Sequence, residues 1–483
     1  MKIPFGGRVL VLGCGAVSRC VQALILRHFD MDFTKLAVMD FVDLRALIPD
    51  TLNAGAAFVQ QRVTPQNLAS TLEKHLGAGD LLIDVAWNID TGEIIQWCYD
   101  HHVLYINTST ELWDPYYDLD NTPPQERTLY VRHMALRKRA ASWAAKGPTS
   151  VIEHGANPGL VSHWTKVALE DITRTLLTSG ELSRQRHRDL DHALHMQEWA
   201  RLAMLTGTKV IHISERDTQV SDQPKQVDEF VNTWSVEGLY EEGIAPAELG
   251  WGTHERRLPE GAHVHLHGPG NQICIAKPGV STYVRSWVPL GGEIIGMVIR
   301  HGEAFTISDY LTVWEDDKPV YRPTVHYAYL PCDAAIASVH EMKMHNFDLQ
   351  ARQRIMRDEI VDGRDELGVL LLGHDLNGWW TGSQLDIHEA RRLVPNQNAT
   401  TLQVAASILG ALKWMIENPR MGLCVPDQLP HRAVLEVANM YLGTTPSLKT
   451  DWTPLKNRFD AFAKFGSPRP RDEDLWQFDT FLC

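Results

Sequence analysis

The sequence has little of what marks a membrane, secreted or disulfide-built protein. Its 483 residues include no run close to the ~20 consecutive apolar residues that a membrane span needs. The start MKIPFGGRVLVLG lacks the small-residue cleavage site of a signal peptide. The seven cysteines form no CxxC pair, so each thiol is expected to be a small buried hydrophobe in a reducing compartment. We therefore expect a cytoplasmic protein that contacts no membrane.

Positive charge is also in short supply. Lysine and arginine number 46 against 60 aspartates and glutamates, which gives a formal net charge of -14. This balance opposes nucleic-acid binding and raises the local concentration of small cations. A cationic substrate is one interpretation, and acidity that serves only solubility is the other. Hydrophobic residues at 44% and charged residues at 22% are globular values, and the length predicts two or three domains.

Strand-like and helix-like patterns alternate over residues 1–155, which predicts βαβ units and a parallel sheet. The expected fold class is α/β, with a Rossmann-type doubly wound parallel sheet as the N-terminal domain. The segments in order are RVLVLGCG, AVSRCVQALILRHF, KLAVMDF, AFVQQRV, QNLASTLEKHL, DLLIDVAW, a helix over 93–99, VLYINTS, and the helix QERTLYVRHMALRKRAASW.

The pattern is less regular from residue 156 onward, and residues 156–394 are expected to form a mixed α+β domain. After Pro395, the Ala-rich segment TTLQVAASILGALKWMIE predicts a helix within 395–445 that returns to the first domain. Residues 446–483 are left as a C-terminal extension. The strands expected in the mixed domain are HVHLHG, STYVRSWVPL, EIIGMVIR and EAFTISDYLTVW.

A glycine-rich turn follows the first strand and opens the first helix. Gly13, Gly15 and Ser18 give G-x-G-x-x-S, with Ala16 and Val17 between the second glycine and the serine. Such a turn brings backbone N–H groups and a helix N-terminus to a pyrophosphate. Serine replaces the usual third glycine, where a small side chain is still tolerated. These five residues are predicted to bind a dinucleotide.

Asp40 makes the turn more specific than a lone glycine motif. It ends the strand KLAVMD, 27 residues after Gly13, where a carboxylate binds both hydroxyls of the adenosine ribose. A carboxylate there would repel a 2′-phosphate, and no arginine follows before Arg45. The prediction is NAD rather than NADP, and the alternative is that Asp40 only caps a helix.

Seven longer strings resemble the bacterial homospermidine synthases, nearly from end to end. The resemblance implies a saccharopine dehydrogenase-like architecture, a mixed substrate and dimerisation domain, and a homodimer. The strings are HGANPGLVS (154–162), HISERDTQ (212–219), FVNTWSVEGL (230–239), PAELGWGTHER (246–256), YRPTVHYAY (321–329), EIVDGRDELGVLL (359–371) and QNATTLQV (397–404).

The resemblance also implies a reaction. Two putrescines would become homospermidine and ammonia through imine intermediates, with NAD used and regenerated in each turnover. The implied partners are small cationic diamines and polyamines, with putrescine first and spermidine open.

Four residues are implied as site residues by their place in these strings. Trp234 would be the ring over which a cationic substrate passes, and Glu215 and Glu242 would be substrate-contacting carboxylates. His301 would lie near the reacting carbon as a neutral imidazole that relays a proton. Taken alone, the tryptophan would more often be a core-packing residue and each glutamate a solvated surface group.

Three further candidates rest on position. Asp90 and Glu111 follow two expected strands at their carboxyl ends, where open parallel sheets place ligands, so both are predicted to bind substrate. Asn157 precedes Pro158, and its amide could orient the nicotinamide or an amine, or could instead cap the next helix.

Two rival functions stay open. His263 and His265 share one face of the string HVHLHG, as in metal-dependent hydrolases, although an edge strand facing solvent explains them more simply. No metal is expected. A saccharopine- or carboxyspermidine-type dehydrogenase would instead need a cationic clamp for a carboxylate, for which Arg216 and Arg285 are available.

Overall fold

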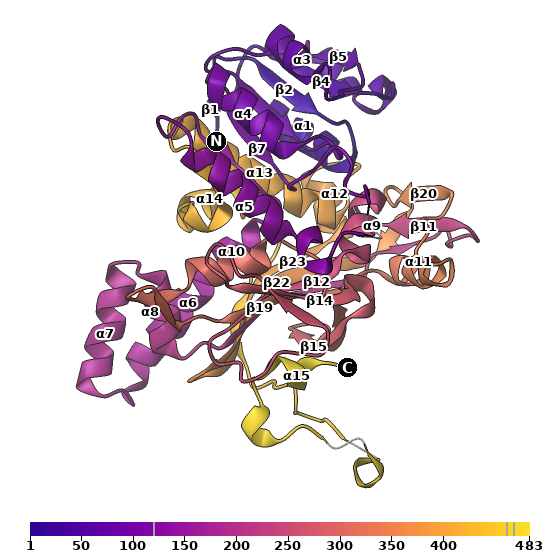
Figure 1. Ribbon diagram of the computed structural model, residues 1–483. Helices are drawn as coiled ribbons and strands as arrows, with labels where there is room; N and C mark the ends of the chain where they lie inside the picture. Colours follow the sequence, from indigo (N-terminus) through magenta and orange to yellow (C-terminus); the bar gives the residue numbers. More distant parts are fainter. Residues whose placement is uncertain (119–120, 460–461, 467–468) are drawn as a thin grey trace.

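The computed structural model describes residues 1–118, 121–459, 462–466 and 469–483, and this part of the chain folds around two large sheets (Figure 1). The N-terminal sheet lies at the top of the view and the second sheet below it. Residues of both parts line the main cavity.

The N-terminal sheet has seven strands in the order β24-β8-β7-β6-β2-β4-β5, and every neighbouring pair is parallel. The doubly wound parallel sheet predicted from the sequence is thus present. Its strands are β2 (Val9–Leu12), β4 (Leu36–Asp40), β5 (Ala57–Gln60), β6 (Leu81–Asp84), β7 (Leu104–Asn107), β8 (Ser150–Val151) and β24 (Leu423–Cys424).

Helices cover both faces of this sheet because its strands alternate apolar side chains to either side. Val9 and Val11 join a core with residues of α1 and α13, while Leu10 and Leu12 join a second core with residues of α3 and α4. A small parallel pair, β1 (Ile3–Pro4) and β3 (Phe29–Asp30), adds to this part. The helices are α1 (Ala16–His28), α2 (Pro49–Asn53), α3 (Leu68–His75), α4 (Thr91–His101) and α5 (Leu129–Ala141).

A segment from late in the chain lies beside these helices. Helix α13 (Ala399–Glu417) packs on α1, and β24 pairs with β8. By length and composition α13 is the one helix in the described residues that could cross a membrane, but 83% of its window is buried. A buried core helix passes the same test, so this is weak evidence for a span.

The second sheet has ten strands and is mixed, because β9 and β19 run parallel while the other pairs are antiparallel. Its main order is β13-β14-β12-β19-β9-β22-β23-β25, and β15 and β16 attach through β19. The strands are β9 (Val210–Asp217), β12 (Pro246–Gly250), β13 (Ala262–Val264), β14 (Gln272–Pro278), β15 (Tyr283–Val288), β16 (Gly292–Met297), β19 (Thr324–Leu330), β22 (Arg364–His374), β23 (Asn377–Asp386) and β25 (Ser447–Thr450).

The two faces of this sheet meet different partners. Ile211 and Ile213 face a core shared with α6 and α13, whereas Val210 faces a core that includes Phe478 and Phe481 near the C-terminus. The remaining helices are α6 (Leu160–Ser179), α7 (Arg184–His195), α8 (Trp199–Thr206), α9 (Val236–Ile244), α10 (Glu303–Tyr310), α11 (Asp333–Met344), α12 (Ile387–Leu393), α14 (His431–Ala438) and α15 (Phe478–Phe481).

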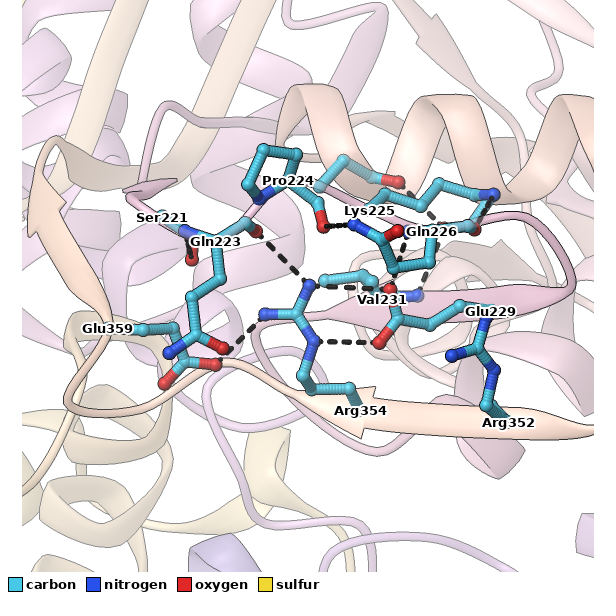
Figure 2. Close-up of polar contacts among 12 residues, drawn as sticks. Ser221, Gln223, Pro224, Lys225, Gln226, Glu229, Val231, Arg352, Arg354 and Glu359 are labelled. Carbon is cyan, nitrogen blue, oxygen red and sulfur yellow. Dashed lines mark hydrogen bonds and ion pairs between the residues drawn. The ribbon is translucent and has the colours of Figure 1, made fainter.

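Three two-stranded pairs complete the structure. One of them, the parallel pair β11–β20, leads directly to Trp234. Figure 2 shows Arg354 of β20 between Glu229 and Glu359: its Nε donates to Glu229 Oε1 (2.9 Å) and its Nη1 to Glu359 Oε1 (3.1 Å). The pairs are β10 (Val220–Ser221) with β21 (Ile360–Asp362), β11 (Glu229–Asn232) with β20 (Arg352–Ile355), and β17 (Val313–Glu315) with β18 (Lys318–Tyr321).

One predicted strand is wrong. The segment EAFTISDYLTVW forms helix α10 over Glu303–Tyr310, and only Val313 onward is a strand. Residues 303–308 are all buried, so the segment shows neither clear alternation nor a polar helix face. A short segment that is buried all round gives no period with which to choose between strand and helix.

Candidate active site

The main cavity has a volume of about 190 Å³ and lies where the two sheets meet. The N-terminal part lines it with Val17 of α1 and with loops after β6 and β7, which are the carboxyl ends of parallel strands. The second part contributes β9, the start of α9, and the segment that holds His301. This is the place where an open α/β sheet binds its ligand.

The glycine-rich turn enters this region as the sequence predicted. Gly13 has φ +85°, and a Cβ on it would lie 2.9 Å from the carbonyl oxygen of Val85, so only glycine fits there. Around Gly15 a Cβ would meet nothing within 4 Å, which leaves its backbone open to a ligand. Helix α1 begins at Ala16, and Val17 lines the cavity. A pyrophosphate fits this open helix N-terminus.

Ser18 occupies the position of the usual third glycine without disturbing the turn. Its side chain is buried, its hydroxyl donates to the Gly13 carbonyl oxygen (2.6 Å), and it accepts from Gln22 Nε2 (3.1 Å). The hydroxyl therefore fastens the first turn of α1 to the loop before it.

Asp40 ends β4 beside the turn. One carboxylate oxygen accepts the N–H of Cys14 (2.8 Å) and the other that of Val42 (2.9 Å). The two contacts hold the carboxylate next to the phosphate turn, where a ribose hydroxyl could donate to its remaining lone pairs. Asp40 is not the N-cap of α1, which is Gly15.

A flat stack beside Asp40 was not predicted from the sequence. The Arg62 guanidinium carbon lies 4.1 Å from the centroid of the Phe41 ring, and Phe41 is 43% exposed. A guanidinium over an exposed aromatic ring offers a flat surface to another planar ring. The signal in the sequence was an aromatic residue directly after Asp40.

Glutamates are the most frequent charged residues of the cavity wall. The lining includes Glu111, Glu153, Glu215, Glu241 and Glu242, against two arginines and one histidine. Glu153 and Glu241 were not predicted. Glu153 adopts φ +54° and pairs with His133 Nε2 (2.9 Å), and nothing in the sequence distinguishes it from a surface glutamate.

Glu215 projects from β9 into the cavity. Its Oε2 accepts from the Tyr327 hydroxyl and from Asn157 Nδ2 (3.1 Å). Burial raises the pKa of Glu215 above that of a solvated glutamate, against the hydrogen bond from Tyr327, which lowers it. Asn157 thus orients a carboxylate. The capping alternative is wrong, because α6 has Gly159 as its N-cap and no side-chain cap.

His301 lies between two carboxylates. Its Nε2 is 2.9 Å from Glu242 Oε2 and its Nδ1 is 3.1 Å from Glu303 Oε1. Burial alone would lower the pKa of His301, but Glu303 and Glu242 together raise it well above its ordinary value. The two contacts and the raised pKa favour a protonated ring, whereas the sequence predicted a neutral imidazole. Burial raises the pKa of Glu242 despite the contact with His301.

Trp234 follows β11 and lines the cavity with part of its indole. Its Nε1 donates to the Tyr329 hydroxyl (3.0 Å). A Cβ on Gly238 would lie only 2.7 Å from Trp234 Cζ3, so the first turn of α9 gives the ring its space. The ring is fixed at one edge and presents apolar surface to the cavity, as a cation–π contact requires.

The two acidic residues predicted at strand ends have different places. Glu111 lines the cavity, where its Oε1 accepts from Ser109 Oγ (2.7 Å), and burial raises its pKa. Asp90 is not among the lining residues: its Oδ1 accepts the N–H of Glu93 (2.8 Å) and caps α4. The structure gives Asp90 a helix-capping role rather than a contact with the cavity.

The comparisons with known proteins agree with this site. The chain is 42% identical over 483 residues to a homospermidine synthase of Blastochloris viridis, with 99% of this chain and 97% of that protein covered. It is 40% identical over 482 residues to a homospermidine synthase of Mesorhizobium japonicum, with 99% and 96% covered. The chain belongs to the homospermidine synthase family. The family resemblance seen in the sequence is thereby confirmed.

A solved structure supports membership of the homospermidine synthase family. The crystal structure of a Legionella pneumophila homospermidine synthase in complex with NAD superposes with a TM-score of 0.87 at 38% identity, covering 100% of this chain and 99% of that one. Two family models also match: the saccharopine dehydrogenase NADP binding domain over residues 9–151 and the saccharopine dehydrogenase C-terminal domain over residues 155–444. The predicted saccharopine dehydrogenase-like fold is confirmed.

The cationic clamp that a dehydrogenase of amino acids would need is absent from the homospermidine synthase cavity as the described residues form it. Arg216 donates to the Gly291 carbonyl oxygen (3.3 Å), and neither it nor Arg285 lines the cavity. The arginines that do line it, Arg132 and Arg300, both bind Glu241 Oε1, at 2.7 and 2.5 Å. Their positive charges are paired with Glu241, a residue of the cavity wall.

The metal-hydrolase alternative has no support in the described residues, where no group of three His, Cys, Asp or Glu side chains could hold a metal ion. His263 lies in β13, an edge strand as predicted. His265 stacks on Tyr130 with ring centroids 4.3 Å apart, and Nε2 lies 3.3 Å from the Thr128 hydroxyl. His265 is therefore a packing residue.

Proposed function

We propose that the protein makes homospermidine and ammonia from two molecules of putrescine. The observation that carries the proposal is a cavity lined by five glutamates and two tryptophans, Trp87 and Trp234, at the carboxyl edge of a doubly wound sheet. It occurs in a chain at least 40% identical to two homospermidine synthases over almost its whole length. A small dication with an aliphatic middle is the complementary ligand.

NAD is the cofactor in this proposal, as in the Legionella complex. Gly13, Gly15 and the N-terminus of α1 would hold its pyrophosphate, and Asp40 its adenosine ribose, where a 2′-phosphate would meet a negative charge. When bound, NAD supplies the acceptance and return of a hydride at an amine-bearing carbon.

The residues of the second part would bind and orient the amines. Glu215, oriented by Asn157 and Tyr327, accepts hydrogen bonds from an ammonium group. Trp234 attracts the migrating cation through its ring face, which favours movement because the attraction has no single fixed geometry. These contacts hold an amine while its neighbour reacts.

Proton transfer in this proposal is assigned to the pair of Glu242 and His301. Glu242 faces the cavity and can take a proton from an ammonium, while His301, held by Glu303 on its other nitrogen, shares the proton at Nε2. The enclosing walls limit the water that could hydrolyse an imine.

The test is incubation of the protein with putrescine and a small amount of NAD. We expect homospermidine and ammonia in amounts that exceed the NAD added many times, with no accumulation of NADH. Accumulation of NADH in proportion to putrescine, or no triamine product, would contradict the proposal.

Variants of Trp234 make the same test specific. Trp234→Phe keeps a ring face and should retain part of the activity, whereas Trp234→Glu should lose it. Equal activity in both would remove the ring from the proposal.

Three further expectations remain predictions: a homodimer, implied by the resemblance; a cytoplasmic location, expected from the sequence features; and acceptance of spermidine beside putrescine. Light scattering of the purified protein tests the first, and product analysis with each amine tests the last.

A further inference from the structure

Strands β9 and β22 bring three carboxyl groups together beneath the cavity. In their antiparallel register Asp365 lies opposite Asp217, and Leu367 lies opposite Glu215. Side chains two apart share a face, so Glu215, Asp217 and Asp365 all project to the side that carries Ile213 and Val369 of the core. The strand register makes the three carboxyls neighbours.

The carboxyl cluster, defined as Glu215, Asp217 and Asp365, is almost completely buried. Its members are 3%, 4% and 0% exposed. Within the described residues no lysine or arginine forms an ion pair with any of them. Buried charge without a counter-ion is disfavoured, so the cluster must reduce its charge by retaining protons.

The hydrogen bonds of the cluster differ between its members. Asp217 accepts from the hydroxyl of Thr233 (2.7 Å) and from the N–H of Gln219 (2.8 Å). Asp365 Oδ2 accepts from the Thr400 hydroxyl, but its buried Oδ1 has no donor. In the register of β9 and β22, Asp365 is the diagonal neighbour of Glu215, and the charge of Glu215 raises the pKa of Asp365 in addition to the effect of burial. Two neighbouring carboxyls can share a hydrogen bond only if one carries the proton.

We propose that Asp365 is a positioning residue that keeps one proton and donates it in a hydrogen bond to Glu215, so that Glu215 stays ionised and aimed at the substrate amine. The proton stays on Asp365 Oδ1, which explains why this oxygen lacks a donor of its own. The amine-binding part of the inference rests on the proposed function. The shared proton does not.

Every group that faces Asp365 is consistent with a retained proton. Glu215 and Asp217 of β9 are acidic, Tyr327 of β19 carries a neutral phenol, and Thr400 of α13 is uncharged. His301 lowers the pKa of Glu215, against the burial that raises it. Burial, then the charges of Glu215 and Asp217, raise the pKa of Asp365 well above its ordinary value.

Infrared difference spectroscopy of the full-length protein tests the proton directly. A protonated buried carboxyl gives a carbonyl band that a carboxylate lacks, and at pH 7 we expect Asp365→Asn to lose one such band. Thr400→Val, which removes the donor to Oδ2 together with an acceptor for Gln219 Nε2, should shift this band without removing it. An unchanged carboxyl region in Asp365→Asn would overturn the inference.

Steady-state kinetics test the positioning role. Asn retains an N–H that can donate to Glu215, so Asp365→Asn should keep the KM for putrescine within about threefold, while Asp365→Leu should raise it about tenfold or more. In the native protein KM should rise at the alkaline pH at which Asp365 loses its proton, and Asp365→Asn should lose that rise. Equal KM changes in Asn and Leu, with native pH profiles, would indicate a structural residue only.

A matched control is Glu255→Gln, which removes a buried carboxyl away from the cavity. Glu255 is bound by Thr324 and by the N–H of Phe478, and burial raises its pKa to about 7. It should leave the putrescine pH profile unchanged. The infrared result needs no turnover, so the two proposals can fail separately. If the native protein makes no homospermidine but Asp365→Asn still loses the band, the proposed function is contradicted and the shared proton is not.

Discussion

Glu215 and Glu241 line the same cavity but have opposite surroundings. Glu241 Oε1 accepts hydrogen bonds from Nη2 of both Arg132 and Arg300. Glu215 accepts hydrogen bonds only from uncharged donors and lies beside two more carboxyls. Burial alone would raise both pKa values. The arginines bring the pKa of Glu241 below its ordinary value, and nothing comparable compensates Glu215, whose pKa stays raised.

This difference separates two uses of a buried carboxylate. An ionised glutamate that is fully paired, such as Glu241, fixes the wall and exchanges no proton near neutral pH. A glutamate with a raised pKa and no fixed cation, such as Glu215, can bind an incoming ammonium and exchange protons with it. The comparison can be tested by making the same substitution at both positions.

The largest effect is expected for Glu215→Gln. Glutamine keeps the shape and can still meet Asn157, but it loses the charge and the exchangeable proton. We expect kcat/KM for putrescine to fall by roughly 10²- to 10⁴-fold, with little loss of thermal stability. Homospermidine formation and a thermal unfolding curve measure the two. Activity within a few-fold of the native protein would show that Glu215 is not a substrate-binding group.

Glu241→Gln should instead lower the free energy of unfolding. It leaves Arg132 and Arg300 buried without their common partner, and breaking a buried ion pair in this way costs about 3–5 kcal/mol. Urea unfolding should show the loss. Replacing Arg132 by Met in the same chain should restore part of it, because one unpaired charge is then gone. A stable Glu241→Gln variant with lost activity would reverse the comparison.

How much of this could be predicted depends on how local each feature is. The positions of Gly13 and Asp40 could be predicted because a single βαβ unit fixes their geometry, and the structure places both at the turn. The position of Glu111 could be predicted for the same reason, because it lies in the loop after a parallel strand. Asp90 had the same argument but became a helix cap, since a residue at a strand end can also begin the next helix.

The rest depends on contacts between distant segments. Arg132 and Glu241 are 109 residues apart, and no spacing in the sequence pairs them. The raised pKa of His301 could not be predicted without knowing that Glu303 and Glu242 lie on both sides of its ring. For Asp365 a weak signal existed: it has the same parity as Leu367 and Val369, so an acidic residue occupies a core-facing position of a buried strand. Only the register of β9 and β22 shows which residue it meets.

A smaller effect is expected for Gly238→Ala, which tests the indole without touching a carboxylate. The added Cβ would lie 2.7 Å from Trp234 Cζ3, so the ring must move. Loss of a cation–π contact of about 0.5–2 kcal/mol corresponds to a rise of roughly 2- to 30-fold in KM. Alanine favours the helix more than glycine, so stability should be unchanged or higher. An unchanged KM would show that the ring position is not critical.

The smallest effect is expected for His301→Gln, which should change how the melting temperature depends on pH. Because the pKa of His301 is raised in the folded protein, its protonation stabilises the fold fully below the unfolded value of about 6.5, and this contribution is lost as pH rises through the folded pKa. The melting temperature of the native protein should therefore fall above pH ~6.5 by about 1–3 °C more than that of His301→Gln. His326 is the matched control: burial lowers its pKa to about 4, so its neutral form is the folded one and His326→Gln should not change the slope above pH ~6.5. Parallel slopes in the native protein and His301→Gln would mean that the ring is neutral after all, and the proton shared between His301 and Glu242 would then have to belong to the glutamate.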